Sequence, residues 1–403
     1  MSTHQDTKTA NANKSAISAE YVVVGGGMVG SAMALGLAKQ GKQIVLIEAF
    51  PAREFAIEQG PDLRMSALAL ASVQLLDNLG AWEHIAALRV QSYNALSVWD
   101  KPWAKTAFHA HEVKQTRLGY FVENRITQLG LTHALLAYAN VTILHTKVDT
   151  ADTQGGIVRC EDGRIVHADW IIAADGVHSG IRKQAGIGTV AWDYEQQALG
   201  ISIQSTYADE ATADIAQGLT WQAFTPDGPQ AFLPMHDNHA SLVWYHHPQR
   251  IAELKALTPA ALKDEICASF SPYLQEQVTD FTVLDKASFG LLRMHAKRYL
   301  QDKVILIGDA AHSINPLAGQ GVNLGFADVA CLLETIEHKR SLARSYELPR
   351  KHANLQMMTA MDALYHLFSN RNPLLNTLRN TGLFLADKGG FAKQAVIKKA
   401  MGL

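Results

Sequence analysis

The sequence predicts an α/β protein in which a parallel, Rossmann-like sheet is interrupted by a mostly antiparallel sheet and followed by helices. The parallel sheet rests on a buried strand, a Gly-rich turn, a helix and a second strand over residues 21–48, and on another buried strand over 304–307. The antiparallel sheet rests on several β-like runs within residues 197–247, separated by turn signals such as Pro226-Asp227-Gly228-Pro229. A chain of 403 residues suits two such domains.

The domain boundaries follow from the places where these patterns change. We expect a flexible polar tail first, and a helical region at the C-terminal end. We also expect helices over 66–88 and 126–139. The predicted segments are 1–19 for the tail, 20–88, 117–185 and 291–345 for a discontinuous dinucleotide-binding domain, 89–116 and 186–290 for an inserted substrate domain, and 346–403 for the C-terminal helices.

Composition excludes several classes of protein. With 36 Lys and Arg against 38 Asp and Glu, the formal charge of −2 gives no global attraction for nucleic acid. The three cysteines are far apart in the sequence, so they indicate neither a disulfide framework nor a metal-binding pair. The apolar runs are strand-sized and do not approach the roughly 20 residues that cross a bilayer.

The first motif is Gly25-x-Gly27-x-x-Gly30, between a buried strand and a helix. In such a motif the first glycine allows the tight turn, the second lets the backbone approach a pyrophosphate, and the third allows close packing of helix and strand. Glu48 ends the second strand, where a carboxylate can accept hydrogen bonds from a ribose diol. The motif therefore predicts dinucleotide binding, and the acid favours FAD or NAD over a 2′-phosphorylated nucleotide.

The second motif runs from Gly308 to Asn323 and follows the strand at 304–307. Asp309 lies at the strand end and can bind a ribityl or ribose hydroxyl; the alternative is a helix cap. Gly319, Gln320 and Gly321 begin a helix and can present N–H groups to an electron-rich ring edge. His312 has either a role beside that ring or a structural hydrogen bond. It lacks partners at ligand spacing, so we predict no metal site.

Two shorter motifs are weaker alone. Asp175-Gly176-Val177-His178-Ser179-Gly180-Ile181-Arg182 again ends an apolar strand, and could equally be an Asx-turn with a capped helix. Within residues 62–68, Asp62 or Ser66 could cap a helix, and Arg64 could be an ordinary surface charge.

Taken in order, the four motifs resemble those of the single-component (class A) FAD aromatic monooxygenases, over roughly residues 20–345. Further segments resemble the ubiquinone-biosynthesis FAD-dependent hydroxylases; these are 118–124, 224–229, 231–234, 241–245 and 400–403. The resemblance implies a glutathione-reductase-type FAD domain, with FAD as the cofactor and NAD(P)H as a transient reductant.

The resemblance also implies roles for individual residues. Arg64 would contact the flavin side of the site, and Gln128 would hold the ribityl–diphosphate region. Asp175 and Gly176 would serve both FAD and NAD(P)H. The ring would be bordered by Pro316, Gly319, Gln320 and Gly321, with His312 handling protons, and the cofactor-binding set would be Gly25, Gly27, Gly30, Glu48, Arg64, Gln128, Asp175, Gly176, Asp309, Gly319, Gln320, Gly321 and Asn323.

The implied reaction is C6 hydroxylation of 2-polyprenyl-3-methyl-6-methoxy-1,4-benzoquinol by O₂, through a flavin C4a-hydroperoxide. Hydroxylation at another ring carbon, a soluble-phenol hydroxylase, an FAD dehydrogenase and a non-catalytic flavoprotein subunit remain alternatives. The resemblance implies a bacterial cytoplasmic protein, soluble or peripherally associated with the inner membrane. It also implies contact with other ubiquinone-biosynthesis proteins, and a homo-oligomer is compatible with it.

The C-terminal region bears on the substrate. Residues 363–403 contain six basic residues and one acidic residue, a net charge of +5, together with several leucines. One interpretation is a helix that covers the FAD domain with a solvated basic face. The other is docking to an anionic membrane or a partner. A polyprenyl tail is too costly to transfer into water for free diffusion, because each buried CH₂ contributes roughly 0.8 kcal/mol.

Overall fold

The computed structural model describes residues 16–270, 272–314, 321–369 and 372–402. Its first sheet is mostly parallel, with strand order β17-β18-β11-β1-β2-β8, and β10 and β9 attached to β11. The parallel neighbours are β1 with β11 and β2, β2 with β8, and β11 with β18. The strands are β1 (Ile17–Val24), β2 (Ile44–Ile47), β8 (Val141–Leu144), β9 (Val148–Asp152), β10 (Ile157–Cys160), β11 (Ile165–Ala173), β17 (Leu300–Gln301) and β18 (Val304–Leu306).

The first sheet is continuously apolar in its central strands, as expected for a parallel sheet covered on both faces. Helices pack on it, and the largest buried cluster lies between them and the strands. These helices are α1 (Met28–Lys39), α4 (Asn124–Leu135), α5 (Gly180–Gln184) and α10 (Gly321–Glu337), with the short 3₁₀ segment η3 (Gly308–Ala310) and the π-helical turn η5 (Ala343–Glu347).

The second sheet is mostly antiparallel, with order β19-β16-β12-β15-β14-β13-β5-β6, as the sequence predicts; β13 and β5 are its parallel pair. Helices cover one side of it with a separate apolar cluster. The strands are β5 (Ala95–Trp99), β6 (Thr106–His109), β12 (Thr189–Thr206), β13 (Leu219–Ala223), β14 (Gln230–Pro234), β15 (His239–His246), β16 (Asp280–Ala296) and β19 (His312–Ser313). The helices here are α6 (Glu210–Gly218), α7 (Pro248–Ala256), α8 (Pro259–Ser269) and α9 (Tyr273–Gln277), with the 3₁₀ segments η1 (Pro102–Ala104) and η2 (Ala110–Val113) nearby.

A small third sheet joins the two halves. It has the order β3-β7-β4, formed by β3 (Met65–Ala69), β7 (Gly119–Glu123) and β4 (Gln91–Tyr93). The helix predicted over 66–88 is therefore wrong at its start: residues 65–69 are a strand, and α2 (Leu70–Asn78) and α3 (Trp82–Ala86) follow. Pairing with β7 explains the difference, because a neighbouring strand can override local helix propensity.

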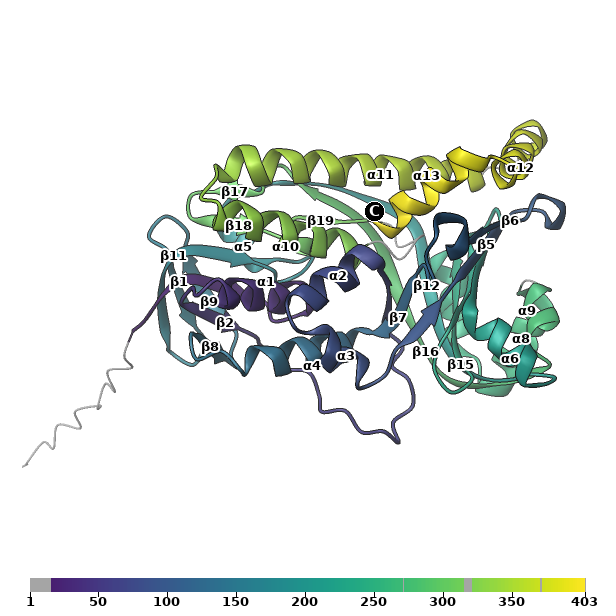
Figure 1. The fold of residues 1–403 in the computed structure, drawn as a ribbon, viewed down its shortest axis with the longest axis horizontal. Helices are drawn as coiled ribbons and strands as arrows, with labels where there is room; N and C mark the ends of the chain where they lie inside the picture. Colours follow the sequence, from purple (N-terminus) through teal and green to yellow (C-terminus); the bar gives the residue numbers. More distant parts are fainter. Residues whose placement is uncertain (1–15, 271, 315–320, 370–371, 403) are drawn as a thin grey trace, which may run out of the picture.

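The long α11 (Leu348–Phe368) runs along the molecule from the parallel sheet toward the antiparallel one, and α12 (Pro373–Asp387) lies beyond its end, against β6 and η1 (Figure 1). The last helix, α13 (Gly390–Met401), turns back toward the middle of the molecule and packs on η2 (Figure 1). β1 begins at Ile17, so residues 17–19, predicted as part of the tail, belong to the sheet. None of the helices among the described residues is both long and apolar enough to cross a bilayer.

Candidate functional site

The turn between β1 and α1 requires glycine at two positions, Gly25 and Gly30. Gly25 has φ +99, and a Cβ there would lie 2.4 Å from the Ala174 carbonyl oxygen. A Cβ on Gly30 would lie 1.9 Å from the Gly25 carbonyl oxygen. At Gly27, by contrast, a Cβ would meet no atom within 4 Å. The first and third glycines therefore serve packing, whereas Gly27 leaves open space at the N-terminus of α1, where a phosphate is favoured.

Two polar side chains meet at the peptide of Gly26, in the middle of this turn. Glu48, just after β2, accepts hydrogen bonds from the N–H groups of Gly26 and Phe50. Gln128 on α4 donates to the Gly26 carbonyl at 2.7 Å. The structure thus brings Glu48 and Gln128 together at the turn, where both stabilise its backbone. Their role in holding a nucleotide stays a prediction.

At the end of β11, Asp175 uses its two carboxylate oxygens differently. Its Oδ2 accepts hydrogen bonds from the backbone N–H groups of Gly180 and Ile181, at 2.8 and 3.2 Å. These bonds cap the start of α5, as in the structural alternative for this motif. Its Oδ1 is buried and has no hydrogen-bond partner among the described residues. Gly176 follows with φ +81. A buried acceptor without a donor costs stability unless a ligand supplies one, so Oδ1 fits a cofactor hydroxyl.

Arg182 connects the third motif to the second. Its buried guanidinium donates to the Ala310 carbonyl at 2.8 Å and to the Val177 carbonyl at 2.7 Å. Burial lowers the pKa of Arg182 from its ordinary value, with the nearby Asp175 carboxylate opposing the shift. The two strand-end motifs, far apart in the sequence, are therefore held at one edge of the parallel sheet.

Asp309 and Arg64 face the same region. Asp309 reaches solvent but lies deep among protein atoms, and this loss of hydration raises the pKa of its carboxyl, opposed by His312 and Arg64. Arg64 is exposed and stacks over the Phe289 ring, 5.3 Å from its centroid. A carboxylate and a guanidinium that both reach open space suit a ligand carrying hydroxyl and anionic groups.

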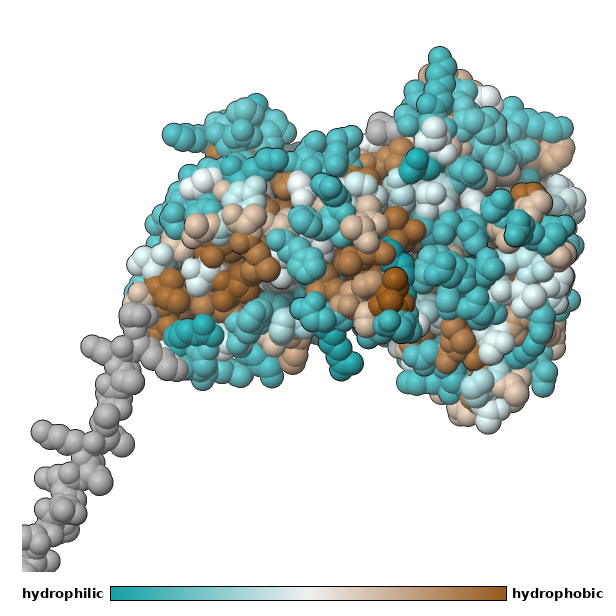
Figure 2. Space-filling model, turned by 60° about the horizontal axis from the view of Figure 1, so that its bottom comes forward, coloured by the Kyte–Doolittle hydropathy of each residue, from teal (hydrophilic) through white to brown (hydrophobic). Residues whose placement is uncertain are grey.

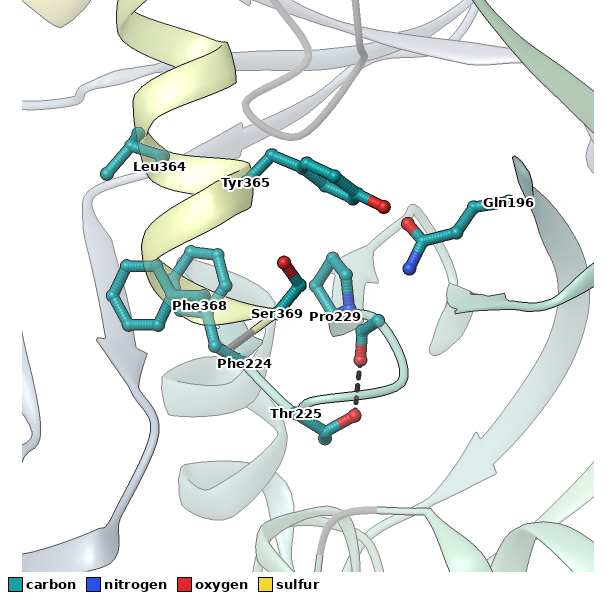
Figure 3. A pocket seen from close by; sticks show the side chains of 9 residues that line it. Gln196, Phe224, Thr225, Pro229, Leu364, Tyr365, Phe368 and Ser369 are labelled. Carbon is teal, nitrogen blue, oxygen red and sulfur yellow. Dashed lines mark hydrogen bonds between the residues drawn. The ribbon is translucent and has the colours of Figure 1, made fainter. Parts of the chain in front are cut away.

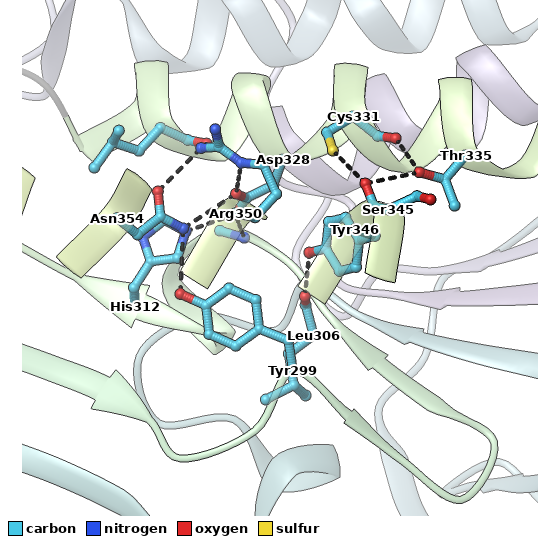
Figure 4. Close-up of polar contacts among 12 residues, drawn as sticks. Tyr299, Leu306, His312, Asp328, Cys331, Thr335, Ser345, Tyr346, Arg350 and Asn354 are labelled. Carbon is cyan, nitrogen blue, oxygen red and sulfur yellow. Dashed lines mark hydrogen bonds and ion pairs between the residues drawn. The ribbon is translucent and has the colours of Figure 1, made fainter. Parts of the chain in front are cut away.

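His312 lies in a buried polar network (Figure 4). Its Nε2 is 2.5 Å from Oδ2 of Asp328 on α10. The same oxygen accepts from the Gly308 N–H at 3.0 Å, and the other oxygen accepts from Arg350 at 2.7 Å and Asn354 at 3.2 Å. Burial opposes ionisation of Asp328, but His312 and Arg350 outweigh it and lower the pKa of this carboxyl.

The network continues to Tyr299 and His295. Asn354 donates to the Tyr299 hydroxyl at 3.2 Å, and this hydroxyl lies 3.1 Å from Nε2 of His295. Burial, helped by the nearby His312, lowers the pKa of His295 to about 4. His312 is thus buried and held by Asp328, a geometry that favours the structural hydrogen bond over the role beside the ring.

Of the remaining predicted site residues, Asn323 and Gly321 belong to the described part of the chain and three others do not. Asn323 is buried on α10 and uses its amide within the protein: it accepts from Ala69 N–H and Ser72 hydroxyl, and donates to the Ala67 carbonyl. It therefore connects α10 to the β3–α2 junction. Gly321 begins α10. The positions Pro316, Gly319 and Gln320 lie outside the described residues.

An apolar pocket lies between the antiparallel sheet and the end of α11 (Figure 3). Phe224 and Phe368 stack across it with ring centroids 3.9 Å apart. Thr225 donates to the Gly228 carbonyl at 2.6 Å and closes the loop between β13 and β14. The pocket volume of about 10 Å³ holds roughly one water. It is too small for an aromatic ring in this conformation.

A larger, open hollow of about 470 Å³ is lined by the loop after β2, by the region after α3 and by the β14–β15 turn. Figure 2 shows hydrophobic surface on one half of the molecule and near the junction, whereas the other half is mostly hydrophilic on this face. Arg89 lines the hollow, but Glu123 binds its guanidinium through two hydrogen bonds of 2.8 and 2.9 Å. Because this cation is already neutralised, the hollow is a poor site for a diphosphate.

Sequence reasoning missed Asp328 and Arg182 as organising residues. Asp328 is fully buried on an otherwise apolar stretch of α10, next to Val329 and two residues after Phe326. A lone acid among apolar helical residues is the signal that could have indicated it, because a buried charge needs partners. Arg182 is part of the motif at 175–182, but nothing in that motif indicates that its guanidinium binds the Ala310 carbonyl.

Comparisons with known proteins identify the family of this chain. Residues 18–357 match the family described as FAD binding domain. The chain is 40% identical over 401 residues to the 3-demethoxyubiquinol 3-hydroxylase of Escherichia coli, covering 95% of this chain and 98% of that protein. It is 31% identical over 420 residues to the ubiquinone biosynthesis monooxygenase COQ6, mitochondrial, of Danio rerio, covering 90% and 86%. Its fold is similar to that of Klebsiella pneumoniae HpxO complexed with FAD and uric acid, with a TM-score of 0.73, 17% identity and coverage of 94% and 96%.

Fold and site together define an FAD-dependent monooxygenase. The chain belongs to the FAD-binding-domain family and, within it, to the ubiquinone-biosynthesis hydroxylases. Its cofactor is FAD, and NAD(P)H is the usual reductant of this class. The open space at Gly27 and the unpartnered Oδ1 of Asp175 fit that cofactor.

Proposed function

We propose that this enzyme is a 2-polyprenyl-3-methyl-6-methoxy-1,4-benzoquinol hydroxylase of ubiquinone biosynthesis. The observation that carries the proposal is the 40% identity to a 3-demethoxyubiquinol 3-hydroxylase, which extends over 95% of the chain and so includes both sheets and the C-terminal helices. In the balanced reaction, O₂ supplies one oxygen atom to the ring and one to water, while NAD(P)H supplies the hydride and a proton enters from solvent.

The position of attack follows from the substrate's substitution pattern. Two hydroxyls, the prenyl chain, the methyl group and the methoxy group occupy five ring carbons, so a single carbon carries hydrogen. In the numbering of this substrate name the methoxy group occupies C6 and the free carbon is C5, so the expected C6 hydroxylation can describe this carbon only under another numbering of the ring. Hydroxylation at another carbon would require a different precursor, which is the alternative within the same family.

The protein's contribution is binding and orientation, because the oxygen chemistry belongs to the flavin. When bound and reduced, FAD would activate O₂ and deliver one of its oxygen atoms to the substrate ring. The α1 N-terminus at Gly27 would receive the diphosphate, and Glu48 would take the ribose hydroxyls. Asp175 and Asp309 would bind cofactor hydroxyls, with Arg64 contributing positive charge near an anionic group.

We place the working enzyme in the bacterial cytoplasm, peripherally at the inner membrane and in contact with other ubiquinone-biosynthesis proteins. A polyprenylated quinol supports this location, because its tail keeps it in lipid or in a lipid-holding complex. A homo-oligomer is compatible with this arrangement.

The decisive test compares substrates on the purified holoenzyme. We expect NAD(P)H oxidation and O₂ uptake to be coupled to hydroxylation of a short-chain demethoxyquinol, with the product identified by mass spectrometry. Coupled turnover with soluble phenols alone would overturn the assignment. In a deletion strain, the demethoxy compound should accumulate; an earlier intermediate would indicate attack at another ring carbon.

A second experiment excludes the non-catalytic alternative. Asp309→Ala is expected to lose FAD, and a folded variant should then fail to restore quinone synthesis in the deletion strain. Restoration by the FAD-free, folded variant would instead indicate a subunit that only holds other proteins together.

A further inference from the structure

Helix α12 has its polar face against the protein and its apolar face outside. Arg379 and Asn380 point inward and are 4% and 0% exposed. Leu374, Leu378 and Leu385 are exposed by 70%, 60% and 60%. Their spacing of four and seven residues places these leucines on one side of the helix. A surface helix of a globular protein ordinarily has the opposite orientation, with the apolar stripe toward the core.

Specific bonds fix this orientation. The Arg379 guanidinium lies 2.8 Å from Oδ2 of Asp100, and the Asn380 amide donates to the same oxygen at 2.7 Å. The Asn380 amide oxygen accepts from Lys101 N–H, and the Thr106 hydroxyl donates to the Leu383 carbonyl. Turning the helix to bury its leucines would leave Asp100 and Arg379 as unpaired buried charges, so the apolar face stays outside.

Two of the segments that pack against α12, which are η1 and α13, also expose aromatic and basic side chains. Trp103 lies in η1, which packs against α12, and is 59% exposed; Lys101 beside it is exposed too. In α13, Phe391 is 87% exposed, and Lys398 and Lys399 are exposed in the last turn. Another exposed cation, Lys388, stacks over the Phe384 ring at 4.2 Å.

Asp387, the one acidic residue of 372–402, is already engaged. Asp387 accepts from Ala107 N–H at 3.2 Å and lies 3.2 Å from Nζ of Lys393. Among the described residues after α12, the exposed charge is therefore carried by Lys388, Lys398 and Lys399.

We propose that the outward face of α12, with Trp103 and Phe391, docks on an anionic phospholipid surface. Exposed leucines enter the acyl boundary, tryptophan prefers the headgroup level, and each lysine near an anionic leaflet adds attraction. A second copy is a poorer occupant. A two-fold contact of this face with itself would bring the lysines of both copies together without an unpaired acid to receive them.

Docking here would bring the apolar pocket close to the lipid. The Arg379 guanidinium lies over the Phe368 ring, 5.5 Å from its centroid, and Phe368 stacks on Phe224 in the pocket. A prenyl chain could then reach the antiparallel sheet with little exposure to water. This last step rests on the proposed function, whereas the docking itself depends only on α12 and its neighbours.

The test measures partition of the FAD-loaded enzyme onto vesicles of phosphatidylglycerol and phosphatidylethanolamine, and onto neutral phosphatidylcholine vesicles, by sedimentation. The variant Leu378→Gln/Leu385→Gln replaces two apolar side chains that are each 60% exposed. The matched control is Leu136→Gln/Ile215→Gln, which changes two side chains of 71% and 70% exposure on α4's end and α6.

We expect the α12 variant to reduce partition onto anionic vesicles by about tenfold or more, since two leucines lose their apolar burial. The control should partition like the parent, and binding should be weaker on neutral vesicles and at high salt. FAD content and turnover of a short-chain, water-soluble quinol should be unchanged in both variants.

Equal partition of the α12 variant and the parent would overturn the docking surface. So would an α12 variant that changes the oligomeric state in analytical ultracentrifugation while the parent does not bind vesicles, because the occupant would then be a second copy. If vesicles bind through α12 but no quinol is hydroxylated, the proposed function fails and the docking stands. If the soluble quinol is hydroxylated but the α12 variant partitions normally, the docking fails and the function stands.

Discussion

Two glycines of the same turn should give opposite phenotypes when replaced by alanine. At Gly30 the new Cβ would lie 1.9 Å from the Gly25 carbonyl oxygen and 3.0 Å from Cβ of Ala174. An ordinary carbon–oxygen contact is more than 1 Å longer, so α1 or the turn must move. Because residues 30–38 of α1 are buried, this movement disturbs the main core. We expect Gly30→Ala to lower the free energy of unfolding by about 3 kcal/mol or more.

Gly27→Ala should behave differently. No atom lies within 4 Å of the new Cβ, and the backbone of Gly27, with φ −67, is open to alanine. Loss of the N-cap preference costs only about 0.5–1 kcal/mol. The methyl group nevertheless fills the space where the cofactor's diphosphate would approach the helix. We therefore expect FAD affinity to fall about tenfold or more, which corresponds to about 1.4 kcal/mol.

The assays are urea denaturation of the apoprotein and FAD binding by quenching of flavin fluorescence. Gly60→Ala serves as a control, since its Cβ also meets no atom within 4 Å and it lies away from α1. If Gly27→Ala bound FAD as tightly as the parent, the diphosphate would not approach this backbone. If Gly30→Ala were as stable as the parent, the close packing of α1 on the turn would not be rigid.

Three further predictions concern the buried polar groups. Asp328→Asn leaves the Arg350 guanidinium without its charge partner and should lower the free energy of unfolding by about 3–5 kcal/mol, measured by urea denaturation, while a change below about 1 kcal/mol would refute the network's importance. Because the pKa of His295 is lowered to about 4 in the folded state against about 6.5 when unfolded, its contribution is present above pH 6.5 and is lost as pH falls toward 4. This amounts to about 3 kcal/mol, and His295→Gln should flatten the acid limb of the stability profile; an unchanged limb would exclude this histidine as its cause. Arg379→Met should loosen α12 from Asp100, seen as faster proteolysis of residues 372–401 with FAD binding retained, whereas parental protease resistance would show that the ion pair does not hold the helix.

Most of the cofactor-side architecture could be predicted because it depends on local patterns. The turn after β1 needs glycine for reasons visible in the spacing, and Glu48 lies at a strand end that hydrophobic periodicity identifies. The β3 strand was missed because its stability comes from β7, more than 50 residues later. The alternative for His312 could not be decided from sequence, since its partner Asp328 lies on the following helix and within an apolar run.

The C-terminal helices show a limit of a different kind. Leucine spacing in 374–385 indicates an amphipathic helix, and the ordinary expectation is that its apolar face is covered by the protein. What reverses α12 is the buried acid Asp100, located on a loop almost 280 residues earlier. Periodicity indicates which residues share a face of a helix. Whether that face points to the protein or to solvent depends on charged residues elsewhere in the fold, such as Asp100. The same +5 charge was therefore compatible with a covering helix and with a docking helix. The Arg379–Asp100 pair holds the polar face of α12 against the protein and leaves the leucines outside. This orientation supports the proposed docking helix.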